Sequence, residues 1–250
     1  MIFKRTFAKL RGQDWLAILI ELMIVIVGVF VGTWVANWNQ VRESQAETRK
    51  MIARLDPRLS ELTDYFRSAR IYYATTRAYS DTAIAGWRSD PRVNDADFVT
   101  AAYQASQIQT LSINGSTWST ILGTDRLRDI ADENLRSDLS LLMASDYTQF
   151  NQTGLDTPYR HNVRRVIPIE IQDAIRKGCG DRRDALAIMT LPRVCKIAIL
   201  PADAAKAAAV LRAHPDLVED LQWHIAAIAA FLENIIPLET ATRRIKRERS

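Results

Sequence analysis

One apolar stretch near the N-terminus limits what this chain can fold into. Residues 15–35 are apolar except for Glu21 and Thr33. A helix of that length is about 31 Å long, which matches the roughly 30 Å hydrocarbon core of a bilayer. Tryptophans, whose rings favour the headgroup region, flank the stretch: Trp15, Trp34 and Trp38. We therefore predict a transmembrane helix at residues 14–37, surrounded by membrane lipid and anchored at both interfaces by these tryptophans.

A cleaved signal peptide is the main alternative to a permanent anchor. The apolar core of a signal peptide spans about 7–15 residues and ends at a small-x-small cleavage site. The stretch here is longer, and residues 33–38 read Thr-Trp-Val-Ala-Asn-Trp, which is a poor cleavage sequence. An uncleaved signal anchor is therefore favoured. The length and the flanking aromatics also disfavour a buried helix of a soluble protein.

The charges on the two sides of the stretch predict its orientation. Four bases and no acid precede residue 14, whereas bases and acids are mixed between residues 42 and 50. Because basic flanks stay in the cytoplasm, we predict that residues 1–13 form a cytoplasmic tail and residues 38–250 an exported domain. In a bacterium this corresponds to an inner-membrane anchor with a periplasmic domain.

Composition excludes other classes of protein. Hydrophobic residues make up 48% of the 250 residues, which is enough for a sizeable core and excludes intrinsic disorder. The net charge is +4, but residues 1–13 and residues 243–249 carry +4 each, so the rest of the chain carries −4. No basic nucleic-acid-binding body is expected, and hence no nucleic acid as a partner.

A chemically distinct stripe runs along the predicted transmembrane helix. At 100° per residue, Gly28 and Gly32 lie within about 20° of Glu21, and Ala17 lies about 40° away. Small residues let helices approach closely, and a carboxylate in lipid seeks a partner. We predict association through this face, either as a homo-oligomer or as a subunit of a larger membrane complex. Two alternatives are that Glu21 leans toward the cytoplasmic edge or serves a proton relay.

The same segment resembles a known group of proteins. Ile20-Glu21-Leu22 leads through Gly28-Val29-Phe30 to Asn37-Trp38-Asn39. This pattern is similar to the N-terminal signature of a family of uncharacterised bacterial single-span envelope proteins. A looser likeness covers residues 116–135. The resemblance implies an inner-membrane anchor with an exported helical domain, and it implies no activity.

The exported region is predicted to be all-α, a helical bundle that continues from the transmembrane helix. Residues 41–55 extend that helix outward, and Asp56 with Pro57 is typical of a new N-cap and first helical position, so a kink is expected there. No convincing strand alternation occurs. The other expected helices cover residues 57–87, 94–107 with Asn94 or Asp95 as the cap, a turn or two around Trp118, 127–149 with a continuation toward 166, 168–177 ended by Gly178, a turn or two at 181–188 between the cysteines, 203–213, and 217–247 bent at Pro237.

Cys179 and Cys195 are the two cysteines of the chain. If this region is exported, they are expected to pair, which would stabilise the fold by roughly 3 kcal/mol. Two buried thiols in a reduced compartment are the alternative. A zinc site is disfavoured, because two ligands are not four and no histidine lies at metal-ligand spacing.

The search for catalytic motifs predicts a protein that is not an enzyme, with no catalytic, cofactor-binding or metal-binding residue. No phosphate loop, dinucleotide fingerprint, zinc-protease motif or nucleophile elbow occurs. His161 is expected in a solvated basic stretch, His214 at a helix end, and His224 as a hydrogen-bonded core residue. Asp132 and Glu133 are expected in the first turn of a helix, where acids favour the helix dipole.

Two further patterns leave alternatives open. Aromatic residues at helical spacing are expected to pack in the core rather than to line a pocket: Tyr65, Tyr72, Tyr73, Tyr79, Trp87, Trp118 and Trp223. Arg70 and Arg77 flank Tyr73 on one face, where they form either an anion site or a solvated edge. The bases of residues 243–249 either contact anionic lipid or belong to a frayed, solvated helix end.

Three functions fit this sequence. The first is a non-enzymatic single-pass protein that associates through its transmembrane helix and presents a periplasmic interaction domain. The second is a sensor of a ligand or of envelope state, which must signal through a membrane partner because about 13 cytoplasmic residues hold no output domain. The third and least favoured is a cell-envelope hydrolase.

Overall fold

A computed structural model of the chain describes residues 15–109, 127, 130–145, 155–183 and 188–247. Most of these residues are helical and very few are in strands, which confirms the all-α prediction. The helices are α2 (Trp15–Trp87), α3 (Asp95–Gln104), α5 (Glu133–Ala144), α6 (Pro158–Val166), α7 (Ile169–Cys179), α8 (Pro201–Arg212) and α9 (Asp216–Arg247). The predicted turns around Trp118 and the end of the 127–149 helix lie outside the described residues.

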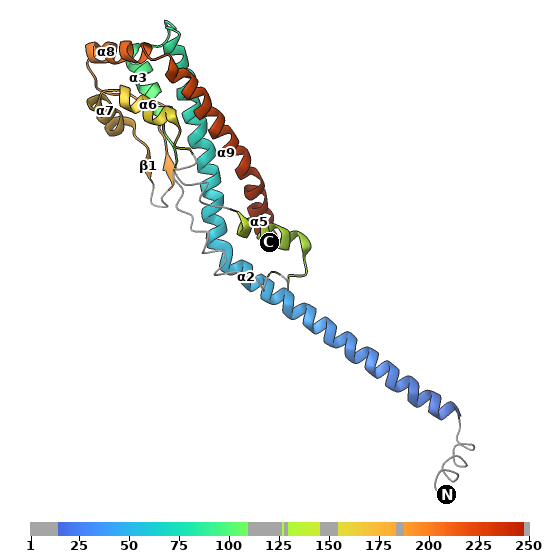
Figure 1. Ribbon diagram of the computed structural model, residues 1–250. Coiled ribbons are helices and arrows are strands. Elements are labelled where there is room, and N and C mark those ends of the chain that lie inside the picture. The colour runs from blue at the N-terminus through green and yellow to red at the C-terminus, as the bar shows by residue number, and fades with distance from the viewer. Residues whose placement is uncertain (1–14, 110–126, 128–129, 146–154, 184–187, 248–250) are drawn as a thin grey trace.

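Helix α2 is a single helix of 73 residues, so it is about 110 Å long. Residues 15–50, the projecting segment, extend away from the other helices, while residues 51–247 form the packed region (Figure 1). The predicted N-cap at Asp56 is wrong, because α2 continues through Pro57. A proline inside a helix loses one backbone hydrogen bond. Burial of Leu55 and Leu59 on either side holds the helix together there, and Figure 1 shows its axis bending as it enters the packed region.

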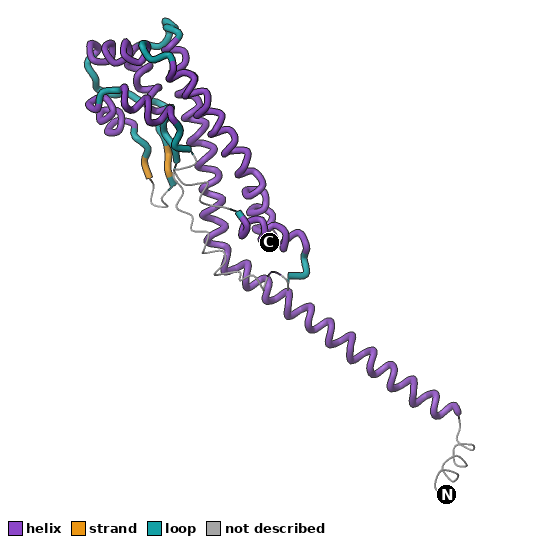
Figure 2. Tube along the Cα trace, viewed as in Figure 1, coloured by secondary structure: helices purple, strands orange, loops and turns teal. Residues whose placement is uncertain are grey.

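Helices α2 and α9 run antiparallel along the length of the packed region (Figure 2). Near the projecting segment, buried side chains of α2, α5 and α9 form one apolar cluster, and the ring centroids of Tyr73 and Phe231 lie 5.5 Å apart within it. At the other end, α3, α6, α7 and α8 enclose a second cluster around the buried side chains of Phe98, Tyr159 and Leu211. Two apolar cores therefore share the α2–α9 pair as their common wall.

Local signals in the sequence explain the starts of α3 and α5. Asn94 caps α3, since its side chain accepts a hydrogen bond from the Asp97 backbone N–H at 2.8 Å. Asp132 caps α5 in the same way through Leu135 at 3.0 Å, so this helix begins at Glu133 rather than at residue 127. The confirmed caps leave the backbone donors of the first turns satisfied.

The segment between the cysteines differs from the prediction. A turn or two of helix was expected at residues 181–188, but Arg182–Arg183 (β1) pairs antiparallel with Met189–Thr190 (β2). The sulfurs of Cys179 and Cys195 lie at disulfide distance, with the Cα atoms 5.4 Å apart. Gly178 does not end α7, which continues to Cys179. The closed loop brings the two short strands together.

We expect Gly86→Ala to destabilise the packed region. Helices α2 and α3 approach so closely that a Cβ atom at Gly86 would lie 2.1 Å from Cδ2 of Phe98, whose side chain is fully buried. The overlap should cost about 1–3 kcal/mol in the free energy of unfolding, measured by circular dichroism. Gly178→Ala is the control, because its Cβ would make an ordinary 3.4 Å contact with Ile197. Equal stability of the two variants would contradict the close approach.

Candidate functional site

Two helices of the described chain are long and apolar enough to cross a membrane: α2 and α9. In α9, 39% of the most apolar 18-residue window is buried, because this helix packs on α2 and α5. In α2, none of the corresponding window is buried. The exposed apolar surface of the projecting segment is therefore what a lipid environment would cover.

The predicted association face is uncovered. A Cβ atom added at Gly28 or at Gly32 would meet nothing within 4 Å. Glu21 is exposed on the same helix, whereas the side chain of Ala17 lies outside the described residues. The hydroxyl of Thr33 donates to backbone oxygens of its own helix, at 2.9 and 3.0 Å. Glu21 is thus the only carboxylate among residues 18–35, and it is exposed to any neighbour of this face.

The tryptophans of the predicted interfaces are exposed as well. Trp15 is 80% exposed, Trp34 73% and Trp38 55%. The guanidinium of Arg42 lies 4.7 Å above the ring of Trp38, so a cation and an indole ring are stacked at the polar end of the apolar stretch. This arrangement is compatible with a headgroup region at Trp38.

Helix α2 buries a different face in the packed region. The residues that it buries there include Met51, Leu55 and Leu62. At 100° per residue, these three positions lie about 120–160° around the helix from Glu21. The two glycines belong to the projecting segment, which extends away from the packed helices, so a second helix could reach their face without displacing those helices.

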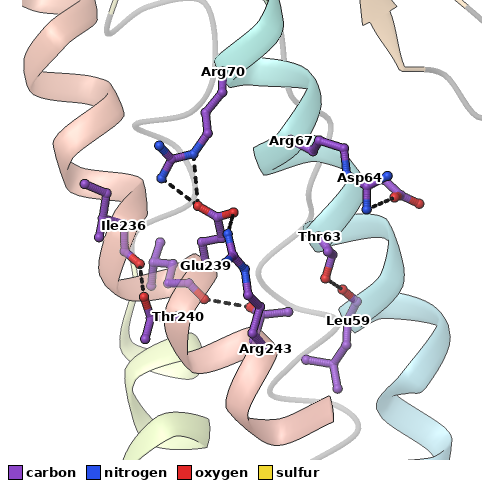
Figure 3. Close-up of polar contacts among 11 residues, drawn as sticks. Leu59, Thr63, Asp64, Arg67, Arg70, Ile236, Glu239, Thr240 and Arg243 are labelled. Atoms are coloured by element: carbon purple, nitrogen blue, oxygen red, sulfur yellow. Dashed lines mark hydrogen bonds and ion pairs between the residues drawn. The ribbon is translucent and has the colours of Figure 1, made fainter. Parts of the chain in front are cut away.

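Ion pairs join α2 and α9 at the end nearest the projecting segment (Figure 3). Arg70 of α2 donates to one carboxylate oxygen of Glu239 from Nε at 3.0 Å and from Nη2 at 2.6 Å, and Arg243 donates to the other oxygen. Burial of Glu239 alone would raise its pKa, but the hydrogen bonds from Arg243 and Arg70 outweigh burial and lower the pKa. The carboxylate is therefore ionised and holds both arginines.

The C-terminal bases do not belong to a frayed, solvated helix end, because α9 continues to Arg247 and two of these bases bind other helices. Arg244 binds the buried carboxylate of Asp138 on α5, with Nε at 2.7 Å, and Lys246 donates to Ser60 of α2 at 3.0 Å. These contacts tie the last turns of α9 to two other helices. Because Arg244 and Lys246 bind protein groups, the alternative that the C-terminal bases contact lipid is weakened.

A groove of about 350 Å³ lies between α2 and α9. Arg70, Tyr73 and Arg77 belong to its α2 wall, so the structure brings together the three residues that the sequence placed on one face. The α9 wall is apolar and was not predicted as part of a site. Its signal in the sequence was the apolar run Ile225–Leu232 within α9.

The histidines are placed largely as predicted. His224 is fully buried, and its Nδ1 lies 2.7 Å from the hydroxyl oxygen of Thr157. Burial, followed by the charge of Arg160, lowers the pKa of His224 to about 4, so the ring is neutral at pH 7. His161 is exposed and lies 3.1 Å from Asp156, and His214 lies 3.7 Å from Asp216.

The stretch around His161 is less solvated than predicted. Arg160 donates to the backbone oxygen of Ser106 at 2.6 Å, and Arg164 donates to the Ser106 hydroxyl at 3.0 Å. Arg164 also stacks on the ring of Tyr103 at 4.9 Å, and burial lowers its pKa. Both guanidinium groups lie just beyond the C-terminus of α3, where the helix dipole favours cations.

Two other expectations were tested by the structure. Asp132 and Glu133 do begin a helix, as predicted. Tyr65, Tyr72 and Tyr73 pack in the core, but Trp223 is 61% exposed, so its assignment to the core is wrong. Its position on α9 faces away from α2. Within the described ranges, no group of three or more His, Cys, Asp or Glu side chains is arranged to hold a metal ion.

The chain matches no protein-family model, no curated protein and no solved structure. The similarity of residues 20–39 to a family of envelope proteins therefore stays a prediction. The function has to be inferred from the geometry of the chain itself.

We expect the packed region to lose stability between pH 6.5 and pH 4. In this interval the unfolded chain protonates His224 while the folded chain, with its lowered pKa, does not. The free energy of unfolding should fall by about 3 kcal/mol as the pH drops, measured by chemical unfolding across this range. His224→Gln should flatten the curve, whereas His161→Gln should leave it unchanged. An identical slope in both variants would contradict this assignment.

We also expect Glu239→Gln to destabilise the α2–α9 contact by about 1 kcal/mol, because both arginines are half exposed to water and compensate in part. The loss should shrink as the pH falls toward the carboxylate pKa. Glu61→Gln is the matched control, since Glu61 pairs with Arg58 on the surface of one helix. Its effect on the thermal midpoint should be close to zero, and a loss as large as that of Glu239→Gln would refute the distinction.

Proposed function

We propose that this chain is a non-enzymatic single-pass membrane protein that associates through the Glu21, Gly28 and Gly32 face of α2. The packed region serves as its interaction domain. The observation that supports this most strongly is the geometry of α2, in which the glycine face is uncovered on the projecting segment while the rest of the same helix packs on α9. In this proposal, α2 makes the membrane contact through its projecting segment and the contact with α9 through its other half.

The physical chemistry of a lipid environment favours such an association. A carboxylate near the middle of a span costs about 2.5–3.5 kcal/mol on insertion scales unless it is neutralised or paired. Gly28 and Gly32 lie two and three turns further along and leave a flat surface, so a second helix can approach closely enough to shield Glu21. The partner is either a second copy or a helix of a larger membrane complex.

The location follows from the charges and the cysteines. We place the N-terminus in the cytoplasm, the apolar part of α2 in the bacterial inner membrane, and the helical bundle in the periplasm. The bases before residue 14 support this orientation. The pairing distance of Cys179 and Cys195 supports an oxidising compartment, because disulfides persist there.

A periplasmic sensor that signals through a membrane partner is the second candidate. The groove between α2 and α9 favours it, since concave apolar sites between helices are where bundles bind small molecules. The same association face would then carry the signal to the partner. The two candidates share the membrane contact and differ in whether a ligand controls it.

The test replaces single residues on opposite sides of the span. Glu21→Leu or Gly28→Ile should abolish the oligomer or the co-purifying partner, measured by cross-linking in native membranes and by native mass analysis in mild detergent. Phe30→Ile is the control, because Phe30 lies about 180° from Glu21 on the helix. If all three variants keep the same assembly, or if the glycine face cross-links only to lipid, the proposal is wrong.

A further inference from the structure

We propose that the groove between α2 and α9 binds an anionic amphiphile, a molecule with one apolar chain and one anionic head, such as a fatty acid. The chain would lie on the α9 wall and the head between Arg70 and Arg77. This inference deepens the sensor candidate by naming its ligand class. It does not depend on whether α2 associates in the membrane.

The α9 wall is suited to an apolar chain. It consists of Ile225, Ile228, Ala229 and Leu232, which follow one another at helical spacing. Ile228 belongs to the core, Ile225 and Leu232 are half-buried, and Ala229 is exposed. A chain lying here would remove from water the apolar surface that α2 and α9 leave open. The volume of about 350 Å³ falls within the range of small-molecule sites.

The α2 wall supplies positive charge at Arg70 and Arg77. Nε of Arg77 is held by Asp81 at 3.1 Å, and Arg70 is held through Nε and Nη2 by Glu239. Within the described residues, no hydrogen bond reaches the terminal nitrogens of Arg77 or Nη1 of Arg70. The two arginines are two helical turns apart, about 10.5 Å along the axis, so their free N–H groups border the same groove.

The charge balance favours an anion. No acid lines the groove, although Asp81 and Glu239 lie behind the two arginines. With Arg243 on the other side of Glu239, the set carries three positive and two negative charges. A guanidinium already oriented by one carboxylate loses less side-chain freedom when it binds a second anion.

The remaining polar atoms of the groove explain why the ligand needs an apolar body. The hydroxyl of Ser80 donates to the Thr76 backbone oxygen at 2.9 Å. The hydroxyl oxygen of Tyr73 accepts from the Gln109 backbone N–H at 3.0 Å. The lining therefore offers hydrogen bonds at the two arginines and apolar contact elsewhere. A peptide, with a polar group at every residue, would leave its backbone without partners on this surface.

The test uses the full chain in phosphatidylcholine nanodiscs and a dodecanoate probe that carries a photoreactive diazirine at the end of its chain. After irradiation, mass spectrometry should find the label on residues 225–232. Unlabelled dodecanoate or dodecyl phosphate should displace the probe, whichever anionic head the natural ligand carries. Displacement by dodecyltrimethylammonium to the same extent, or by inorganic phosphate alone, would overturn the proposal.

Matched variants locate the contacts. Ala229→Trp should fill the groove and abolish labelling, while Ala230→Trp, one exposed position away on α9 and outside the lining, should not. Arg77→Gln should reduce labelling about five-fold through the loss of one charge-assisted contact. Arg67→Gln should leave it unchanged, because Arg67 pairs with Asp64 away from the groove. Undiminished labelling of Ala229→Trp would refute the site.

The same experiment separates this inference from the association proposal. Gly28→Ile, which should break the membrane contact, should label like the unchanged chain. Loss of labelling in Gly28→Ile alone would overturn the claim that the site is independent of association. Labelling of a chain that is monomeric under all conditions would support the groove while contradicting the membrane contact.

Discussion

The antiparallel contact between α2 and α9 is the interaction on which the packed region depends. It provides a shared wall for two apolar clusters, one shared with α5 and one enclosed by α3, α6, α7 and α8. Without α9, the buried face of α2 around Phe66 and Tyr73 would be left to water, since Phe231 and Ile235 cover it. The exposed apolar area would cost far more than the net stability of an ordinary domain allows. The smaller helices α3, α5, α6, α7 and α8 pack around this pair.

Two buried carboxylates fix the alignment of this contact. Glu239 lies between Arg70 of α2 and Arg243 of its own helix, and Asp138 of α5 accepts from Arg244. A shift of α9 by one turn would separate Glu239 from Arg70 and would leave the buried carboxylate of Asp138 without Arg244, which is unfavourable. The apolar side chains alone, being mostly Leu, Ile and Ala along α9, would tolerate such a shift better. The ion pairs therefore contribute to register more than to overall stability.

Much of the fold could be predicted from the sequence, because local residue patterns determine where most of its helices lie. Helical spacing predicted the end of α2 at Trp87 and the extent of α9, and side-chain chemistry predicted a cap at Asn94 or Asp95 and a helix start at Asp132 and Glu133. The failures involve tertiary contacts. Pro57 resembles a helix start locally, but burial on both sides of it keeps one helix intact. Likewise, the Arg70–Glu239 pair joins residues 169 positions apart, and no local pattern reports such a pairing. The two walls of the groove are also brought together only by the packing of α9 on α2.

The unbroken course of α2 has a mechanical consequence. No loop separates Gly32 from Tyr73, so the helix has no swivel between its apolar end and the packed helices. A helix resists twisting because backbone hydrogen bonds join its turns, and the one bond lost at Pro57 lies where Leu55 and Leu59 are buried on either side. If a neighbour turned the apolar end about its axis, the wall that carries Arg70 and Arg77 would turn with it. Rotation about the helix axis, rather than a change of length, is thus the motion that α2 can transmit between its two ends.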